Sequence, residues 1–293
     1  MKMINYKDMT NGFLGKFGLR LTREPVNLNP YFHEYESSFV ITEKLRNFFV
    51  RELTNSSFQA LRHVNCFKDF SKDDFRDEVI SFLNIFQNRP DFFKSNIGGS
   101  GFDNAFWIFL VSKLLSPSLV IESGVWKGQT SWLFEQACPK AKIHGFDISL
   151  SQLVNTTQKV VFHEQDWAEY ELQVAGTDTG LCFFDCHISH VKRLKEAFDR
   201  GFKFILLDDN VPAHLVHAFS APPLPSLEMI LSEEYEPGDI IEWSFRGRKK
   251  KYIFQDEDFE NIRELVEDYI VFPDIGTKTR YGRYSFLSFV KLK

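Results

Sequence analysis

From about residue 100 onward, apolar and polar positions follow two alternating patterns. Short apolar runs, typical of buried strands, occur at residues 119–121, 143–146, 160–163, 181–184 and 202–207. Stretches with apolar residues at helical spacing lie between them, as in Thr130–Ala137 and Val191–Phe198. Strands that alternate with helices form a mostly parallel sheet covered on both faces. The pattern therefore predicts an α/β fold.

The first third of the chain predicts helices instead. Apolar residues recur at helical spacing over 42–61 and 73–86, and the proline of Arg89-Pro90 ends the second helix. A glycine-rich joint, Gly98–Gly101, follows. A third apolar helix over 104–115 then leads into the first strand.

These patterns divide the chain into two parts. We predict an N-terminal helical or lid region over 1–97 and an α/β domain over 98–293. The alternation stops at about 211–250. Prolines at 212, 222, 223 and 225, with His214 and His217 between the first two of them, favour an irregular insertion at the mouth of the sheet. After it, Phe259–Tyr269 predicts a helix and Ser285–Lys291 predicts a closing strand.

A motif suited to a nucleotide-like ligand follows the first strand. Glu122 ends the apolar run, Gly124 and Gly128 come four residues apart, and Thr130 opens the next helix. Glycines let the chain turn tightly and let a ligand approach its backbone, and a helix start offers free N–H groups. Asp147 comes 19 residues after Gly128, where an acid accepts hydrogen bonds from ribose hydroxyls. The spacing predicts an adenosine-containing ligand.

This motif resembles that of the class I S-adenosylmethionine-dependent methyltransferases, whose sugar and natural-product branch has acid-x-Gly-x-x-x-Gly-x-Thr/Ser. The resemblance implies a Rossmann-like, mostly parallel seven-stranded sheet that ends in an antiparallel strand. It also implies S-adenosyl-L-methionine as the cofactor. In the resembled family a helix precedes the first strand, and the loop before that helix often lies over the cofactor. Gly98–Gly101, before the helix at 104–115, is therefore expected either over the cofactor or as an ordinary linker between helices.

Two residues behind the third strand extend the cofactor-binding candidates. Asp166 is placed to accept a hydrogen bond from the adenine amino group, and the indole of Trp167 is placed to stack on the ring. Core filling is the alternative for Trp167.

Acids also follow the fourth and fifth strands. Asp185 comes after the fourth strand, and Asp208, Asp209 and Asn210 come after the fifth. Ligands of open α/β sheets lie at the carboxyl ends of the strands, and oxygen donors suit Mg²⁺ or a similar divalent metal. Capping of strands and helices is the alternative. Several small-molecule O-methyltransferases of the resembled family carry acids at these places and bind a divalent metal.

The catalytic candidates are the two histidines behind Asp185. Methyl transfer to oxygen requires that the acceptor lose its proton, and a nearby imidazole can take it. The sugar-modifying relatives are similar in placing a histidine shortly after this acid, which leaves His187 and His190 as alternatives. Cys186 and Ile188 depart from the small or acidic residues expected beside Asp185.

The composition of the chain indicates which kinds of binding partner to expect. The 293 residues are 43% hydrophobic and 26% charged, with a formal net charge of −5, so nucleic acid is not an expected partner. The chain has no apolar run long enough for a membrane span, and its four cysteines show no Cys-x-x-Cys spacing, so we expect a cytoplasmic protein. A homo-oligomer is one of the states that the sequence leaves open. The basic run Arg246–Lys251 predicts a solvated turn, with binding of an anionic substrate group as the alternative.

The sequence thus predicts a metal-dependent O-methyltransferase acting on a hydroxyl of a small molecule, with a saccharide or glycosylated natural product favoured. An NAD(P)- or nucleotide-sugar-binding oxidoreductase is the first alternative, although Gly-x-Gly-x-x-Gly and a Tyr-x-x-x-Lys pair are absent. A non-catalytic binding module with the same fold is the second.

Overall fold

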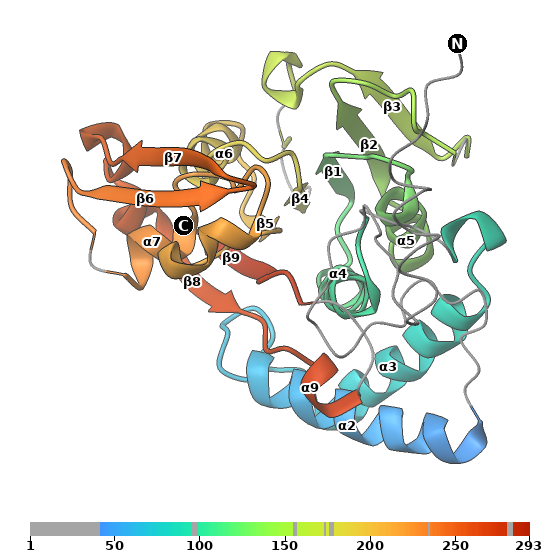
Figure 1. Ribbon diagram of the computed structural model, residues 1–293. Helices are drawn as coiled ribbons and strands as arrows, with labels where there is room; N and C mark the ends of the chain where they lie inside the picture. Colours follow the sequence, from blue (N-terminus) through green and yellow to red (C-terminus); the bar gives the residue numbers. More distant parts are fainter. Residues whose placement is uncertain are drawn as a thin grey trace, which may run out of the picture.

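A seven-stranded sheet forms the centre of the molecule. The computed structural model describes residues 42–94, 99–154, 157–172, 174–175, 179–233, 235–279 and 284–293. The strands of the sheet are β1 (Leu119–Ser123), β2 (Lys142–Asp147), β3 (Val160–Glu164), β4 (Gly180–Phe184), β5 (Phe204–Leu207), β8 (Val266–Val271) and β9 (Ser288–Leu292). Within the described residues their order is β3-β2-β1-β4-β5-β9-β8 (Figure 1). Strands β1 to β5 pair in parallel, whereas β9 runs antiparallel to both β5 and β8.

The sheet confirms the expected mostly parallel α/β architecture with an antiparallel last strand. All five residues of β1 and of β4 are buried, as expected for strands that are covered on both faces. Their side chains alternate between two cores: Leu181 and Phe183 join one core, and Cys182 and Phe184 join the other. This period of two is the strand geometry that the apolar runs predicted.

The described helices cover the two faces of the sheet. They are α2 (Glu43–Leu61), α3 (Lys72–Gln87), α4 (Phe102–Leu115), α5 (Gln129–Ala137), α6 (His190–Asp199), α7 (Leu227–Leu231), α8 (Ile262–Leu265) and α9 (Gly276–Thr279). Side chains of α2 to α5 enter one core, and those of α6 to α8 enter the other. The central helix α4 is buried almost all round, because α3 packs on one side of it and α5 on another (Figure 1).

The N-terminal helical prediction is confirmed for the described part, whereas residues 1–41 and Gly98 lie outside it. Thr42 caps α2 through its side chain, and Ser71 with Asp74 forms a capping box at α3. Phe82 on α3 packs against three phenylalanines of α4. The helices before residue 97 therefore share one core with the sheet domain, and the division at 97 stays a prediction.

The insertion at about 211–250 contains no crossover to another strand of the main sheet in its described part. It holds the 3₁₀ helix η4 (Ala213–Ala218), α7 and the hairpin of β6 (Ile240–Phe245) and β7 (Arg248–Ile253). Of the basic run Arg246–Lys251, the first two residues form the turn of this hairpin, as expected, and the other residues belong to the strand β7.

One predicted element is wrong. The helix expected over Phe259–Tyr269 ends after the four residues of α8, and β8 begins at Val266. Val266, Ile270 and Val271 are β-branched and pair with β9, so the sheet supplies their hydrogen bonds and packing. None of the described helices is both long and apolar enough to cross a membrane.

Candidate active site

A cavity of about 830 Å³ lies at the carboxyl ends of the parallel strands. Its lining comes from the loop before α4, from the turn after β1, from the ends of β2 to β5 and from the insertion. The site candidates that line it are Gly124, Asp147, Asp166, Asp185, His187, Asp208 and Asp209. Residues far apart in the sequence meet here because parallel strands end at the same edge.

The turn after β1 lies against the loop after β4. Gly124 has a φ of +103°, and a Cβ there would come within 2.4 Å of the carbonyl oxygen of Asp185. Only glycine permits both the backbone angle and this approach. Gly128, with a φ of +81°, starts α5 and does not line the cavity. Gly124 therefore allows the turn to pack against the loop after β4, whereas Gly128 allows the chain to enter α5.

Two residues of the motif lie behind the cavity wall. Glu122 is fully buried, and Ser131 donates a hydrogen bond to its carboxyl group. Burial raises the pKa of Glu122 to about 8. Thr130 is buried as well, with its hydroxyl 3.3 Å from that of Ser100. Glu122 therefore connects β1 to α5, and Thr130 connects α5 to the loop before α4.

Asp147 faces the cavity from the end of β2. Its Oδ2 accepts hydrogen bonds from the N–H groups of Val125 at 3.0 Å and of Trp126 at 3.1 Å. Oδ1 accepts from the Ser149 N–H. The carboxylate therefore ties the turn after β1 to β2, and it keeps an edge toward the cavity.

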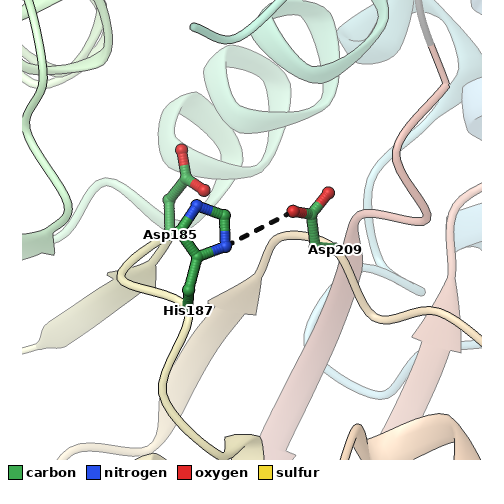
Figure 2. A group of neighbouring side chains, drawn as sticks. All are labelled: Asp185, His187 and Asp209. Carbon is green, nitrogen blue, oxygen red and sulfur yellow. Dashed lines mark ion pairs between the residues drawn. The ribbon is translucent and has the colours of Figure 1, made fainter. Parts of the chain in front are cut away.

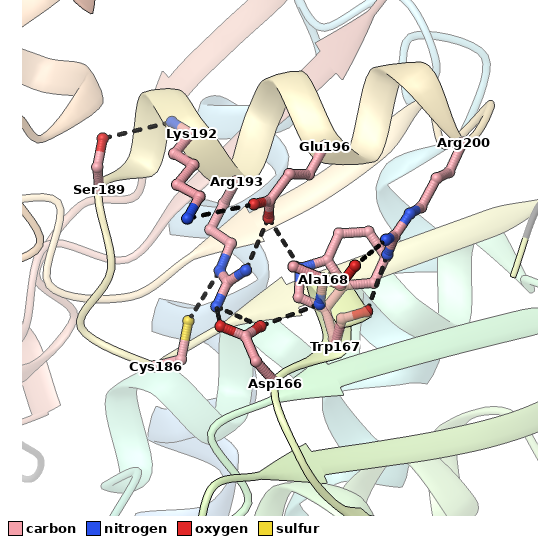
Figure 3. Close-up of polar contacts among 9 residues, drawn as sticks. All are labelled: Asp166, Trp167, Ala168, Cys186, Ser189, Lys192, Arg193, Glu196 and Arg200. Carbon is pink, nitrogen blue, oxygen red and sulfur yellow. Dashed lines mark hydrogen bonds and ion pairs between the residues drawn. The ribbon is translucent and has the colours of Figure 1, made fainter. Parts of the chain in front are cut away.

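A buried arginine connects the residues that follow β3 and β4 in the sequence (Figure 3). The Arg193 guanidinium donates to Asp166 at 2.9 Å, to Glu196 at 2.7 Å and to the Cys186 sulfur at 3.2 Å. Burial acts to raise the pKa of Asp166, but hydrogen bonds from Arg193 and from the Ala168 N–H outweigh it and lower that pKa. Arg193 was missed from the sequence because nothing there shows that α6 crosses behind Asp166.

Trp167 lies on the far side of this network. Its side chain is 1% exposed, packs against Phe184 and Phe202, and donates from Nε1 to Glu196. The indole therefore fills the core, as the alternative from the sequence held, and it does not line the cavity.

Asp185, His187 and Asp209 form a compact cluster (Figure 2). One ligand atom of each lies within 4.8 Å of the others, and His187 Nδ1 is 3.6 Å from Asp209 Oδ2. Burial and the nearby carboxylates of Asp208 and Asp209 raise the pKa of Asp185 well above its usual range. Such crowding of acids is relieved when a cation binds between them.

The backbone of this cluster is strained. His187 and Asp209 have φ values of +55° and +52°, in the left-handed region that side chains usually avoid. Strained residues of this kind cluster at functional sites, where the surrounding structure holds them in place. The strain therefore adds to the case for a functional role of these two residues.

The remaining candidates from this edge serve different contacts. Asp208 lines the cavity, and its Oδ1 accepts from Asn104 at 2.9 Å and from Ser285 at 2.5 Å. Asn210 is fully buried and donates to the Tyr269 hydroxyl. Its amide thus points away from the cavity lining.

His190 is buried beside Asn210. Its Nε2 lies 3.0 Å from the carbonyl oxygen of Asp208 and its Nδ1 lies 3.2 Å from Asn210 Oδ1. Burial lowers the pKa of His190 to about 4. Of the two histidines left open by the sequence, only His187 faces the cavity.

Two apolar residues of the cavity were not singled out from the sequence. Trp126 and Ile148 line it with 43% and 83% of their surface exposed. They flank Asp147, one through the turn after β1 and one directly along the chain. Large exposed apolar groups beside a polar anchor are typical of a ligand site. In the sequence, Trp126 lies between the two glycines of the motif and Ile148 directly follows Asp147, and these positions could have marked both as ligand contacts.

The strand order and the antiparallel β9 are those of the class I methyltransferase fold. Comparison with known proteins adds solved structures of similar proteins. Two structures named cmcI, one with SAH and one with Mg-SAM, match at 18% and 17% identity with TM-scores of 0.35 and 0.34. They cover 42% and 41% of this chain, which spans 66% and 57% of their own lengths.

The SAH-bound methyltransferase PaMTH1 of Podospora anserina matches at 14% identity with a TM-score of 0.36, over 69% of this chain and 97% of its own. Neither a protein-family model nor a curated protein matches the sequence. These TM-scores all lie below 0.5, and the fold class of the chain follows from its own strand order.

Proposed function

We propose that the protein is an S-adenosylmethionine-dependent O-methyltransferase that acts on a hydroxyl of a small molecule and uses a divalent metal. One observation carries the proposal: a single cavity joins the turn after β1 and Asp147 to the cluster of Asp185, His187 and Asp209. A methyl donor and an acceptor must meet in one enclosed site for transfer to occur.

The methyl donor would occupy the end of the cavity lined by Gly124, Asp147 and Asp166. Asp147 would accept hydrogen bonds from the ribose hydroxyls, and Asp166 would accept from the adenine amino group. Trp126 and Ile148 would cover the apolar faces of the adenosine.

The acceptor end of the cavity fits a divalent cation. Asp185 and Asp209 would hold it, with Asp208 as a further oxygen donor from the same edge. The raised pKa of Asp185 supports this assignment, because a cation offsets the repulsion among these carboxylates. When bound, such a cation would orient the acceptor and lower the pKa of its hydroxyl.

His187 would act as the base. Half of its side chain is exposed in the cavity wall, and Asp209 lies beside its Nδ1. The acceptor oxygen would pass its proton to the imidazole as it takes the methyl group, so that one C–O bond forms, the C–S bond breaks and S-adenosylhomocysteine leaves. A role of His187 as a metal ligand is the alternative for this residue.

Ligand-dependent stability tests the cofactor. At a concentration of 100 times its dissociation constant, S-adenosylhomocysteine should stabilise the protein by about 2.7 kcal/mol, while NAD⁺ should have no effect. Thermal unfolding with each ligand measures the difference. Stabilisation by NAD⁺ alone would favour the oxidoreductase.

Formation of S-adenosylhomocysteine from S-adenosylmethionine, measured over a panel of hydroxylated compounds with and without Mg²⁺, tests transfer. Binding of the cofactor product without transfer to any compound of the panel would favour the non-catalytic module.

A further inference from the structure

The part of the cavity lining that comes from the insertion includes an arginine that the proposed reaction does not use. Arg246 lines the cavity at the tip of the β6–β7 hairpin, next to Phe245. In Figure 1 the β6–β7 hairpin lies near β4 and β5, and the cavity lining includes residues that follow both strands. Arg246 and the acids at the ends of these strands therefore face the same space.

The charge of Arg246 is available. Among the described residues it makes no hydrogen bond or ion pair, and its guanidinium carbon lies 5.1 Å from the centre of its neighbour's ring, that of Phe245. The other arginine of the described lining, Arg193, already serves Asp166 and Glu196. Among the lining residues that the structure describes, Arg246 is thus the arginine whose charge is left for a ligand.

A neighbouring histidine is less suited to bind an anion. His217, also in the lining, has its Nδ1 3.0 Å from the carbonyl oxygen of His214, to which it donates. One of its two ring nitrogens is therefore already engaged within the protein. In the described lining, Arg246 offers the guanidinium whose N–H groups are all available to a ligand.

The turn itself does not call for arginine. Arg246 and Gly247 form a two-residue hairpin loop with φ values of +50° and +77°. Asparagine and glycine are the residues preferred in such a type I′ turn, because a left-handed φ is unfavourable for longer side chains. An arginine here lowers the stability of the turn, so its presence points to a role of the side chain.

The position of the tip is fixed by a neighbour. Lys250 on β7 donates from Nζ to the carbonyl oxygen of Ser220, a residue of the lining that follows η4. Its Nζ also lies 5.6 Å from the Phe245 ring centre. These contacts join the hairpin to the segment after η4 and hold Arg246 over the cavity.

We propose that the acceptor carries an oxyanion, a carboxylate or a phosphate, that pairs with Arg246 while its hydroxyl lies at Asp185, His187 and Asp209. The planar guanidinium offers paired N–H groups that match either oxyanion. This inference rests on the proposed function and adds to it the chemical class of the acceptor.

Matched pairs of probes test the inference by binding, without the need for turnover. Glucuronate is compared with glucuronamide, caffeate with caffeamide, and glucose 6-phosphate with glucose, each by calorimetric titration of the full chain. EDTA is present throughout, so that a bound cation cannot be the source of a preference for acids. The first two pairs report on a carboxylate and the third on a phosphate.

We expect the anionic member of at least one pair to bind tenfold or more tightly than its neutral partner. Arg246→Asn should abolish this preference and raise the unfolding temperature, because asparagine suits the turn. Arg246→Lys should keep part of it. Arg248→Gln, at the neighbouring exposed position outside the lining, should leave it unchanged.

Equal binding within all three pairs, or a preference that survives in Arg246→Asn, would overturn the inference. The affinity for S-adenosylhomocysteine, measured on the same preparations, reports on the proposed function separately. If the wild-type protein prefers the anionic probes but does not bind S-adenosylhomocysteine, the result counts against the methyltransferase proposal alone.

Discussion

At the scale of single residues, the site combines strain with crowded charge. His187 and Asp209 hold left-handed backbone angles, and Asp185 lies among carboxylates that raise its pKa. Both features lower stability, and neither is needed to build the sheet. Substitutions at this edge should therefore affect activity more than folding.

Asp209→Ala tests the proposed cation site. It should reduce metal-dependent methyl transfer by at least a hundredfold, because the pair Asp185 and Asp209 would lose one of its two carboxylates. Binding of S-adenosylhomocysteine should stay nearly unchanged. Transfer rates against Mg²⁺ concentration, with Asp199→Ala on the exposed end of α6 as the control, measure the effect. Unchanged turnover would rule out the metal proposal.

Glu122→Gln tests the buried acid behind the turn. Folding raises the pKa of Glu122 from 4.5 to about 8, so the native state keeps a proton that the unfolded state releases. The contribution is fully present below pH 4.5 and is lost as pH rises to about 8, at about 1.4 kcal/mol per pH unit. Glutamine cannot ionise, so the variant should lack this part of the pH dependence.

Urea unfolding of both proteins at pH 5.5 and 7.5 measures the difference in slope, because the stability of the variant relative to the wild type should rise between these values. An identical pH dependence would mean that Glu122 is ionised in the folded protein.

At the scale of elements, α6 positions two loops of the cavity through Arg193. The guanidinium contacts Asp166 behind β3 and Cys186 behind β4, and the side chain is 1% exposed. This contact needs the helix, the 3₁₀ turn η3 (Trp167–Glu169) and the loop after β4 to meet, which no local pattern of the sequence encodes.

Arg193→Met should destabilise the protein by about 3 kcal/mol, because it leaves the partly buried Asp166 without its charged partner. It should also weaken binding of S-adenosylhomocysteine, since Asp166 faces the proposed adenine site. Lys192→Met, at an exposed position one residue earlier, should change stability by less than about 0.5 kcal/mol. Equal losses of stability and of S-adenosylhomocysteine binding in the two variants would contradict a positioning role of Arg193.

Element by element, the sequence predicted strands best where they are buried on both faces. β1 and β4 read as unbroken apolar runs because helices cover both of their sides. The apolar positions of β8 also suit helical spacing over a short window, so the sequence pattern predicts a helix there. Pairing with β9, which is formed from a distant part of the chain, decided between the two.

At the scale of the whole molecule, one core joins the N-terminal helices to the sheet. Phe82 of α3 packs on Phe102, Phe106 and Phe109 of α4, across the boundary that the sequence favoured at 97. α4 in turn packs on α5 and joins the same core as side chains of β1 and β4. The chain should therefore unfold as a unit.

Phe82→Ala tests this expectation. Loss of the fully buried ring should cost about 3–5 kcal/mol, and it should shift a single transition rather than detach the first helices. Phe92→Ala, whose ring is about half exposed, should cost less than about 1 kcal/mol. Calorimetry with circular dichroism follows the transitions. Two separate transitions in the variant would favour an independent N-terminal region.

The sequence by itself determined the class of the fold and the edge of the sheet where the candidates gather, because apolar periodicity and the ends of parallel strands are local properties of the chain. The tertiary structure decided which candidates face the cavity. Asp185, His187 and Asp209 do so, whereas Trp167, His190 and Asn210 are buried among their neighbours. The direction of a side chain depends on what packs behind it, and those partners come from distant segments.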